Sequence, residues 1–240
     1  MPLKKYSKKS VRKSVKKFTR KPSMKRSSLV SLIKKVSLKP VETKHTHNIG
    51  ENINLFHNVP EISYAHLNTT QSIADNNAGV SNFASRLGDE IILRGLSYKF
   101  WFANKLDRPN VMYKIVFFKY QSKAAPGSNA PFYSQGTANF MIRDLDTEQF
   151  KIIKVVNFNL QTNAQKIITI GGALVGAEGH RAISVYIPLK NYKCKYENGT
   201  TIPRFQDFAY TIIAYDSYGT ATTDNIASYA VNRKLYFKDP

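Results

Sequence analysis

Residues 88–120 constrain the fold more than any other stretch, because they hold two long apolar runs without a helical period. In the first run apolar side chains recur at every second position, with Ser97 and Lys99 between them. The residues that share the apolar face are Leu96, Tyr98, Phe100 and Phe102. Such alternation is typical of a β-strand, and residues 103–110 between the two runs are rich in turn formers. We therefore predict two long antiparallel strands that seed an all-β core.

The chain beyond residue 44 also has the pattern of strands joined by polar loops. The other predicted strands are 45–56, 62–67, 139–143, 149–160, 166–170, 182–189, 207–215 and 225–237. Apolar and aromatic residues fill both faces of 207–215, which predicts a strand buried on both sides. About eight to ten strands without an internal repeat indicate a sandwich or a barrel.

Positive charge is concentrated at the N-terminus. The chain carries 36 Lys and Arg against 16 Asp and Glu, a net charge of +20. Residues 1–44 hold 16 of the cations and one acid, Glu42, so this segment accounts for +15. Like charges at this density repel one another, and few apolar groups offset the entropy of ordering. We predict that residues 1–44 are an arm that stays largely disordered until it binds a polyanion, and that residues 45–240 form one β domain.

The candidate nucleic-acid-binding residues of the arm all lie within residues 1–26. They are Lys4, Lys5, Lys8, Lys9, Arg12, Lys13, Lys16, Lys17, Arg20, Lys21, Lys25 and Arg26. The same clusters would serve as a nuclear localisation signal, which needs only exposed Lys and Arg. A solubilising tail or a cloning remnant is the alternative, but twelve positive charges without one acid are far from an ordinary surface.

Residues 27–40 are less charged and allow two interpretations. Ser28 can cap a short helix over 27–37 with an apolar side, and Pro40 would stop its continuation. The alternative is an extended segment that lies along a neighbouring surface, and the sequence does not separate the two.

Several classes of site are disfavoured. Cys194 is the only cysteine, so a disulfide within the chain and Cys-based zinc sites are excluded. No run approaches the length of a membrane span. No phosphate-binding loop, His-Glu-x-x-His or Gly-x-Ser-x-Gly motif is present. We therefore predict a protein that is not an enzyme and that has no cofactor, no metal site and no membrane span.

One pattern favours an enzyme with a metal site instead. His45-Thr46-His47 together with Tyr192-Lys193-Cys194-Lys195 is similar to the His-x-His and Tyr-x-x-Lys signature of rolling-circle nicking endonucleases. The residue between the histidines is not bulky and apolar, and the pair borders the basic arm. Exposed histidines beside a basic segment are the simpler interpretation.

The 14 Tyr, 14 Phe and one Trp supply many rings that could stack on bases. Most lie on strand faces, where core packing is the ordinary explanation. Tyr98 and Trp101 with Lys99, or Tyr113 with Lys114, could instead form an aromatic and basic platform for a single strand. The candidate base-stacking residues are Tyr98, Trp101 and Tyr113.

A basic arm followed by about two hundred residues of strands and loops resembles the coat proteins of small viruses with circular single-stranded DNA genomes, the circovirus-like group. The local likeness lies in Arg86-Leu87-Gly88-Asp89-Glu90-Ile91, in Arg94-Gly95-Leu96, in Tyr98-Lys99-Phe100-Trp101-Phe102 and in Tyr113-Lys114-Ile115-Val116-Phe117-Phe118. It covers about thirty residues as a motif. The arm departs from the family habit, since it holds thirteen Lys and three Arg where many relatives are Arg-rich.

The resemblance implies a single eight-stranded antiparallel jelly roll, with roughly sixty identical subunits in a closed icosahedral shell. It also implies genome packaging by the arm, DNA rather than RNA as cargo, possible contacts with the nuclear import machinery, and location in the virion and the host nucleus. Coat proteins of satellite RNA viruses have a similar plan. A single-stranded-DNA-binding or nuclear shuttle protein that never assembles is the other interpretation.

Overall fold

The computed structural model describes residues 33, 42–69, 86, 88–136, 138–161, 168–170, 173–175, 179–197, 200–218 and 220–239. The chain divides into two units, Met1–Lys39 and Pro40–Pro240. Ile33 is the one described residue of the first unit, so the fold is that of the second unit, which we call the body.

The described part of the body consists of strands and one short 3-10 helix, η1. The elements are β1 (Thr43–Phe56), β2 (Glu61–Ser63), η1 (His66–Thr69), β3 (Glu90–Asn104), β4 (Asn110–Gln121), β5 (Lys151–Gln161), β6 (Ile168–Ile170), β7 (Ala173–Val175), β8 (His180–Lys195), β9 (Gln206–Asp216) and β10 (Asn225–Lys238). The prediction of an all-β body is confirmed.

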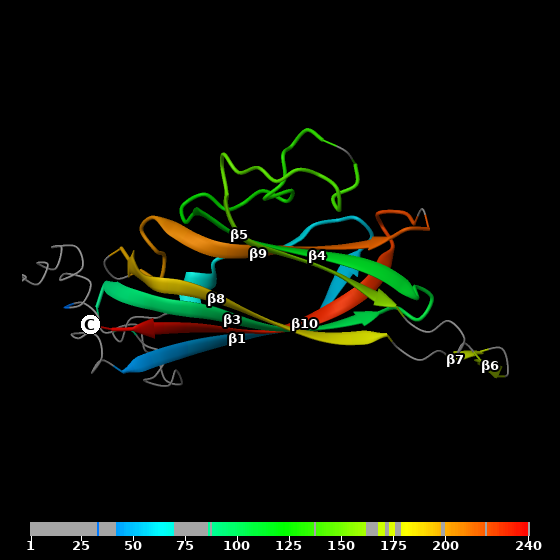
Figure 1. Cartoon of the computed structure of the whole chain (residues 1–240), viewed down its shortest axis with the longest axis horizontal. Helices are drawn as coiled ribbons and strands as arrows, with labels where there is room; N and C mark the ends of the chain where they lie inside the picture. The colour runs from blue at the N-terminus through cyan, green and yellow to red at the C-terminus, as the bar shows by residue number, and fades with distance from the viewer. Residues whose placement is uncertain are drawn as a thin grey trace, which may run out of the picture. The chain divides into compact units, whose positions relative to one another are not determined.

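Two four-stranded sheets face each other (Figure 1). Sheet A has the order β1-β10-β3-β8, and sheet B has the order β2-β9-β4-β5. Neighbouring strands are antiparallel in both sheets, and β6 and β7 form a separate small hairpin. The body is therefore a β-sandwich, as the strand pattern predicts.

The core between the sheets is built from the apolar face of β3. Phe100 contacts the ring of Tyr210 on β9 edge to face at 5.3 Å between centroids, and Phe102 lies 4.9 Å from Tyr113 on β4. Tyr98, Phe100 and Phe102 are buried, as their alternation predicts. Tilted and edge-to-face contacts of this kind add to the free energy gained from apolar burial.

β3 and β4 do not form the hairpin that the sequence predicts. β3 pairs with β10 and β8 in sheet A, whereas β4 pairs with β5 and β9 in sheet B. The chain thus crosses between the sheets at residues 105–109. Period-two alternation determines which face of a strand is buried, but it carries no information about which distant strand satisfies the backbone.

The strands near the C-terminus agree with prediction. β9 is buried on both faces, because sheet A packs against one face and the segment 122–150 covers the other. The apolar residues of β10 alternate and point into the core. The inward residues of β10 are Tyr229, Val231, Leu235 and Phe237. β8 likewise turns Val185, Ile187 and Leu189 inward.

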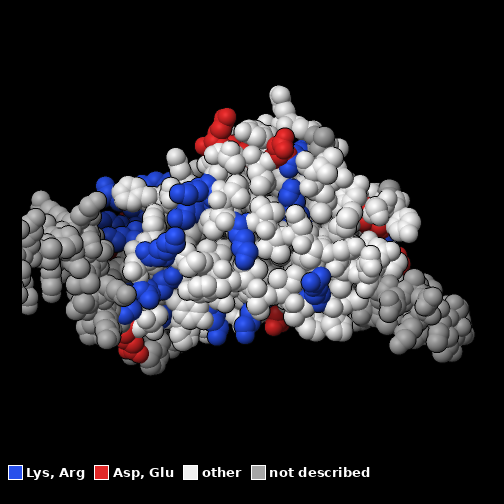
Figure 2. Space-filling view, viewed as in Figure 1, with Lys and Arg blue, Asp and Glu red and all other residues white. Residues whose placement is uncertain are grey.

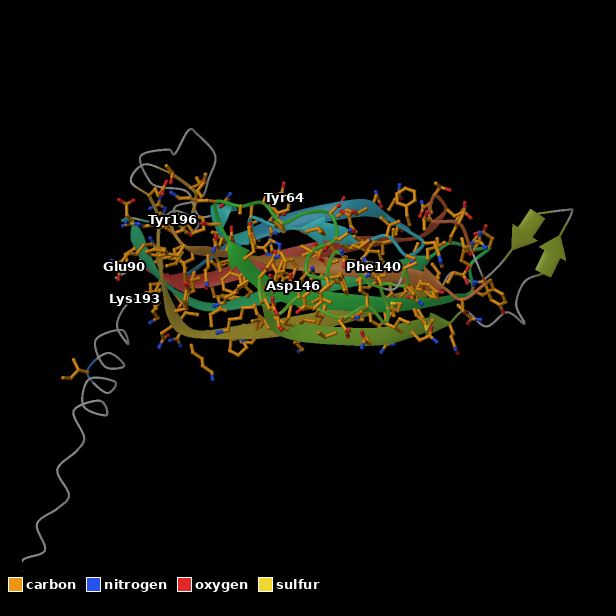
Figure 3. The ribbon with its side chains drawn as sticks, turned by 90° about the horizontal axis from the view of Figure 1, so that it is seen from above. Tyr64, Glu90, Phe140, Asp146, Lys193 and Tyr196 are labelled. Carbon is orange, nitrogen blue, oxygen red and sulfur yellow. The ribbon has the colours of Figure 1, made fainter. Side chains whose placement is uncertain are left out.

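The segment 122–150, which joins β4 to β5, lies over the outer face of sheet B (Figure 1). A second apolar cluster forms there, in which Phe132 and Phe140 pack with Phe118 of β4. Phe140 and Asp146 lie above the middle of the sheets (Figure 3). The Lys114 ammonium donates to the carbonyl of Met141 at 3.0 Å, and burial lowers the pKa of this lysine. The outer face of sheet B is therefore covered at β4 and β9.

Residues 139–143 form turns, so the strand predicted there is wrong. The Asn139 side chain accepts a hydrogen bond from the amide of Met141, and the Asn139 carbonyl accepts one from Arg143. An Asn that bonds its own backbone two residues further on favours a turn over a strand. The apolar pattern in this stretch instead places Phe140 in the second cluster.

Buried polar groups attach η1 to β9 and β3. Asp207 accepts hydrogen bonds from the amides of Leu67 and Phe208 at 2.9 and 2.6 Å. The His66 ring nitrogen Nδ1 lies 2.8 Å from the Tyr98 hydroxyl. Burial raises the pKa of Asp207 from 3.8 to about 6 and lowers that of His66 well below 6.5.

We expect Asp207→Asn to change the pH dependence of stability. The folded protein binds a proton at Asp207 more readily than the unfolded chain does, so this carboxyl favours folding below pH 3.8 and loses that contribution as pH rises to about 6. Asn cannot titrate. The free energy of unfolding of the variant relative to wild type should therefore rise by about 3 kcal/mol across this window and stay level above it.

Urea unfolding between pH 4 and 7.5 measures this difference. Asp207→Ala is the control, because it also removes the acceptor for two buried amides and should be less stable than Asp207→Asn at every pH. Parallel pH profiles for wild type and Asp207→Asn would contradict the raised pKa.

Candidate nucleic-acid interface

The arm residues predicted to bind nucleic acid all lie outside the described residues. The predicted helix over 27–37 also lies outside them, apart from Ile33, whose backbone is helical. The interface that can be built from contacts and distances is therefore on the body.

Two of the three predicted base-stacking residues are corrected by the structure. Tyr98 and Tyr113 have no exposed surface, because both rings point between the sheets. Lys114, the cation predicted to accompany Tyr113, is buried under the segment 122–150. Alternation along β3 puts Tyr98 on the opposite face from Trp101, and only Trp101, which is 49% exposed, is open to a ligand.

Trp101 belongs to a surface that we call the outer face of sheet A, the side turned away from sheet B. The strand register brings four strands together on it. Its outward residues are His45, His47 and Ile49 of β1; Ser228, Ala230, Asn232, Lys234 and Tyr236 of β10; Ser97, Lys99, Trp101 and Ala103 of β3; and His180, Ala182, Ser184, Tyr186 and Pro188 of β8. Among the described residues no segment covers this face as 122–150 covers sheet B (Figure 1).

Two exposed aromatic side chains dominate the outer face of sheet A. Trp101 stacks on the imidazole of His180, with ring centroids 4.7 Å apart and planes 15° from parallel. Tyr186 is 54% exposed and reaches across β3 to Gly95. A Cβ at Gly95 would lie only 2.5 Å from the Tyr186 Cζ, so a residue without a side chain is required there.

The middle of this face carries positive charge. Lys99 and Lys234 are its cations, and none of the outward residues named above is acidic. Glu90 lies further along the same side of β3, where it opposes Lys195. In the register Trp101 opposes Ala182, Lys99 opposes Ser184 and Ser97 opposes Tyr186. Lys99 therefore lies between the two aromatic residues along the sheet, an arrangement that suits bases on either side of a phosphate.

A second group of cations lies where β3 begins and β8 ends, and Figure 2 shows Lys and Arg gathered at this end of the body. The Lys119 ammonium lies 4.2 Å from the centre of the Tyr192 ring, and Lys151 opposes it in the register. Burial and the charge of Lys151 lower the pKa of Lys119. The two cations therefore repel each other, and a bound anion would relieve that repulsion.

Asp89 and Glu90 are acids at the same end of the body. Glu90 is hydrogen-bonded to Lys193 and lies 3.5 Å from Lys195, and the contact with Lys193 lowers the pKa of Glu90 (Figure 3). Exposed ion pairs of this kind contribute little stability. They leave the cluster with an excess of positive charge.

The residues that imitate a nicking site do not converge. His45 and His47 lie on β1 and Tyr192 lies on β8, and these strands are opposite edges of sheet A with β10 and β3 between them. Three strand spacings separate them by roughly 14 Å. Among the described residues there is no group of three or more His, Cys, Asp or Glu side chains placed to hold a metal ion.

Sequence analysis identified Trp101 but missed Tyr186 and His180. The sequence does contain a pattern that identifies Tyr186. In residues 182–189 the inward residues are Ile183, Val185 and Ile187, so Tyr186 falls on the solvent face of the strand. An aromatic residue at such a position is a candidate contact. Its proximity to β3 depends on a pairing between distant parts of the chain.

No protein-family model matches the chain, and no curated protein sequence shows significant similarity to it. No helix among the described residues is long and apolar enough to cross a membrane.

Proposed function

We propose that the chain is a structural coat protein that assembles into a closed shell and packages single-stranded nucleic acid. The observation that carries the proposal is the division between a segment of net charge +15 with hardly an acid and a β-sandwich body whose net charge is +5. A counterion-releasing segment supplies affinity for phosphates, which look alike in every sequence. A rigid body can meanwhile make repeated contacts with its own copies.

The strand order supports a jelly roll as the finer description of the body. The pairs β1·β10, β2·β9, β3·β8 and β4·β5 are nested, first with last and second with second last, as in a long hairpin rolled up on itself. Eight strands in two facing sheets of this kind are used by viral capsid domains, and also by lectins and cupins. The fold alone does not define the function, so the basic arm is needed to choose among them.

The connections between strands supply apolar surface for contacts between subunits. Ile142, Phe205 and Tyr218 are large apolar or aromatic side chains that are more than half exposed, and all three lie outside the sheets. Exposed residues of this kind are common at interfaces. The polar loops at 57–87, 122–137 and 216–227, in so far as they are described, are the natural place for contacts between copies and for the outer surface.

The quantity of charge is adequate for packaging. Sixty arms at about +15 each would bring roughly 900 positive charges inside a shell, enough to neutralise a large share of a strand of one to two kilobases. DNA is favoured over RNA by the family resemblance only. The same Lys and Arg clusters would direct the protein to the host nucleus before it enters the virion.

Electron microscopy of the purified full-length protein tests this proposal. We expect uniform closed particles, and nuclease typing of their contents identifies the nucleic acid. Small soluble oligomers that bind single strands without closing would instead support a single-strand-binding or nuclear shuttle protein. The exposed aromatic residues on the outer face of sheet A would suit that second function equally well.

A further inference from the structure

We propose that the outer face of sheet A is an ordered binding site for unpaired bases, which stack on Trp101 and Tyr186 while Lys99 contacts the phosphate between them. The inference rests on the proposed function, because it assigns to the body a second contact with the packaged strand. The arm supplies charge, and this face supplies fixed geometry.

Tyr186 is held in position for stacking. Its hydroxyl and ring edge occupy the space that a side chain at Gly95 would fill, so the ring rests against the backbone of β3. More than half of its surface remains open to solvent. A ring fixed on one side and open on the other loses little conformational entropy when a base stacks on it.

Trp101 is restrained in a similar way. The imidazole of His180 stacks on the indole, and half of the indole stays exposed. Trp101 and Tyr186 stand four register positions apart along the paired strands β3 and β8, which corresponds to roughly 13 Å. The two rings are thus too far apart to contact each other and can hold separate bases.

The cations occur where a backbone between these bases would run. Lys99 is exposed on β3 between Trp101 and the row of Tyr186, and Lys234 opposes Ser97 in that row. No acid lies between Trp101 and the row of Tyr186 on these strands, and Glu90 at the start of β3 is opposed by Lys195, so the charge around the two rings complements a polyanion. Bases in a duplex are already stacked on their neighbours, so the site selects single strands of DNA or RNA.

Intrinsic fluorescence gives a direct test, because Trp101 is the only tryptophan of the chain. The full-length protein is titrated with a dT oligonucleotide and, separately, with a duplex of equal length. We expect the single strand to quench Trp101 emission and the duplex to bind through the arm without the same quenching.

Affinity measurements with matched variants complete the test. At elevated salt, where the contribution of the arm is weakened, Tyr186→Ala should lower the affinity for the oligonucleotide by roughly 5- to 150-fold, with an unchanged slope of log K against log salt. Tyr186→Phe keeps the ring and should bind as wild type does. Val155→Ala, at an exposed apolar residue of β5 in sheet B, is the control and should have no effect.

Three outcomes would overturn the inference. If the oligonucleotide binds while Trp101 emission and the affinity of Tyr186→Ala stay unchanged, the arm alone carries binding and the proposed function survives. If Trp101 emission depends on protein concentration without nucleic acid, the face is an interface between copies. If nothing binds, the proposed function fails with it.

Discussion

A chain that lacks residues 1–40 is expected to form closed particles that contain no nucleic acid. The deletion removes fifteen Lys and Arg and no acid, so the net charge falls from +20 to +5. If every one of these cations contacts a phosphate, the slope of log K against log salt for a single strand becomes less steep by about 10. Affinity at physiological salt then falls by several orders of magnitude. The ratio of absorbance at 260 and 280 nm of purified particles measures the loss.

A variant of unchanged length separates charge from the mere presence of the arm. Replacing the twelve Lys and Arg of residues 1–26 by Gln should empty the particles as the deletion does. Replacing the Lys residues of the same segment by Arg keeps the charge and should preserve packaging. Loss of closed particles in the Gln variant would mean that the arm is also needed to assemble the shell. That result would contradict the proposal that the arm binds nucleic acid while the body alone makes the contacts between copies.

Phe100→Ala is expected to destabilise the body by about 3–5 kcal/mol. Phe100 is 2% exposed and its ring contacts aromatic side chains of β3, β4, β9 and β10. The substitution leaves a cavity between the sheets at their centre. Since folded domains are stable by only about 5–15 kcal/mol, this single change removes a large part of the total. Thermal unfolding followed by circular dichroism gives the measurement.

Phe205→Ala is the matched control, because Phe205 is exposed in the connection before β9. Its stability should stay within about 0.5 kcal/mol of wild type. Equal destabilisation of the two variants would mean that the sheets do not close over Phe100 as described.

The sequence predicts strands well where a local pattern decides the outcome. Alternation along β3 and β10 defines the buried faces, and the unbroken apolar run of β9 indicates burial on both sides. It fails where distant parts of the chain decide. The partners of β3 are β8 and β10 rather than β4, and no short window of sequence contains that information.

The candidate site follows the same rule. The basic arm is evident from composition, but its twelve predicted contacts lie outside the described residues. Tyr98 and Trp101 are indistinguishable as aromatic residues beside Lys99, and the parity of a strand separates the buried ring from the exposed one. The contribution of Tyr186 depends on the approach of β8 to Gly95, which only the folded sheet provides.

The position of β10 has a consequence for synthesis on the ribosome. β10 is made after every other strand that the structure describes, yet it lies in the middle of sheet A, between β1 and β3. The backbone of β1 can therefore pair only after β10 has been made, and the ion pair of Lys44 with Asp239 then joins the start of β1 to the residue after β10. Translation that stops before β10 leaves β1 without a partner in the sheet and β3 paired with β8 alone, so such chains are expected to stay incompletely folded rather than to form a slightly shortened body.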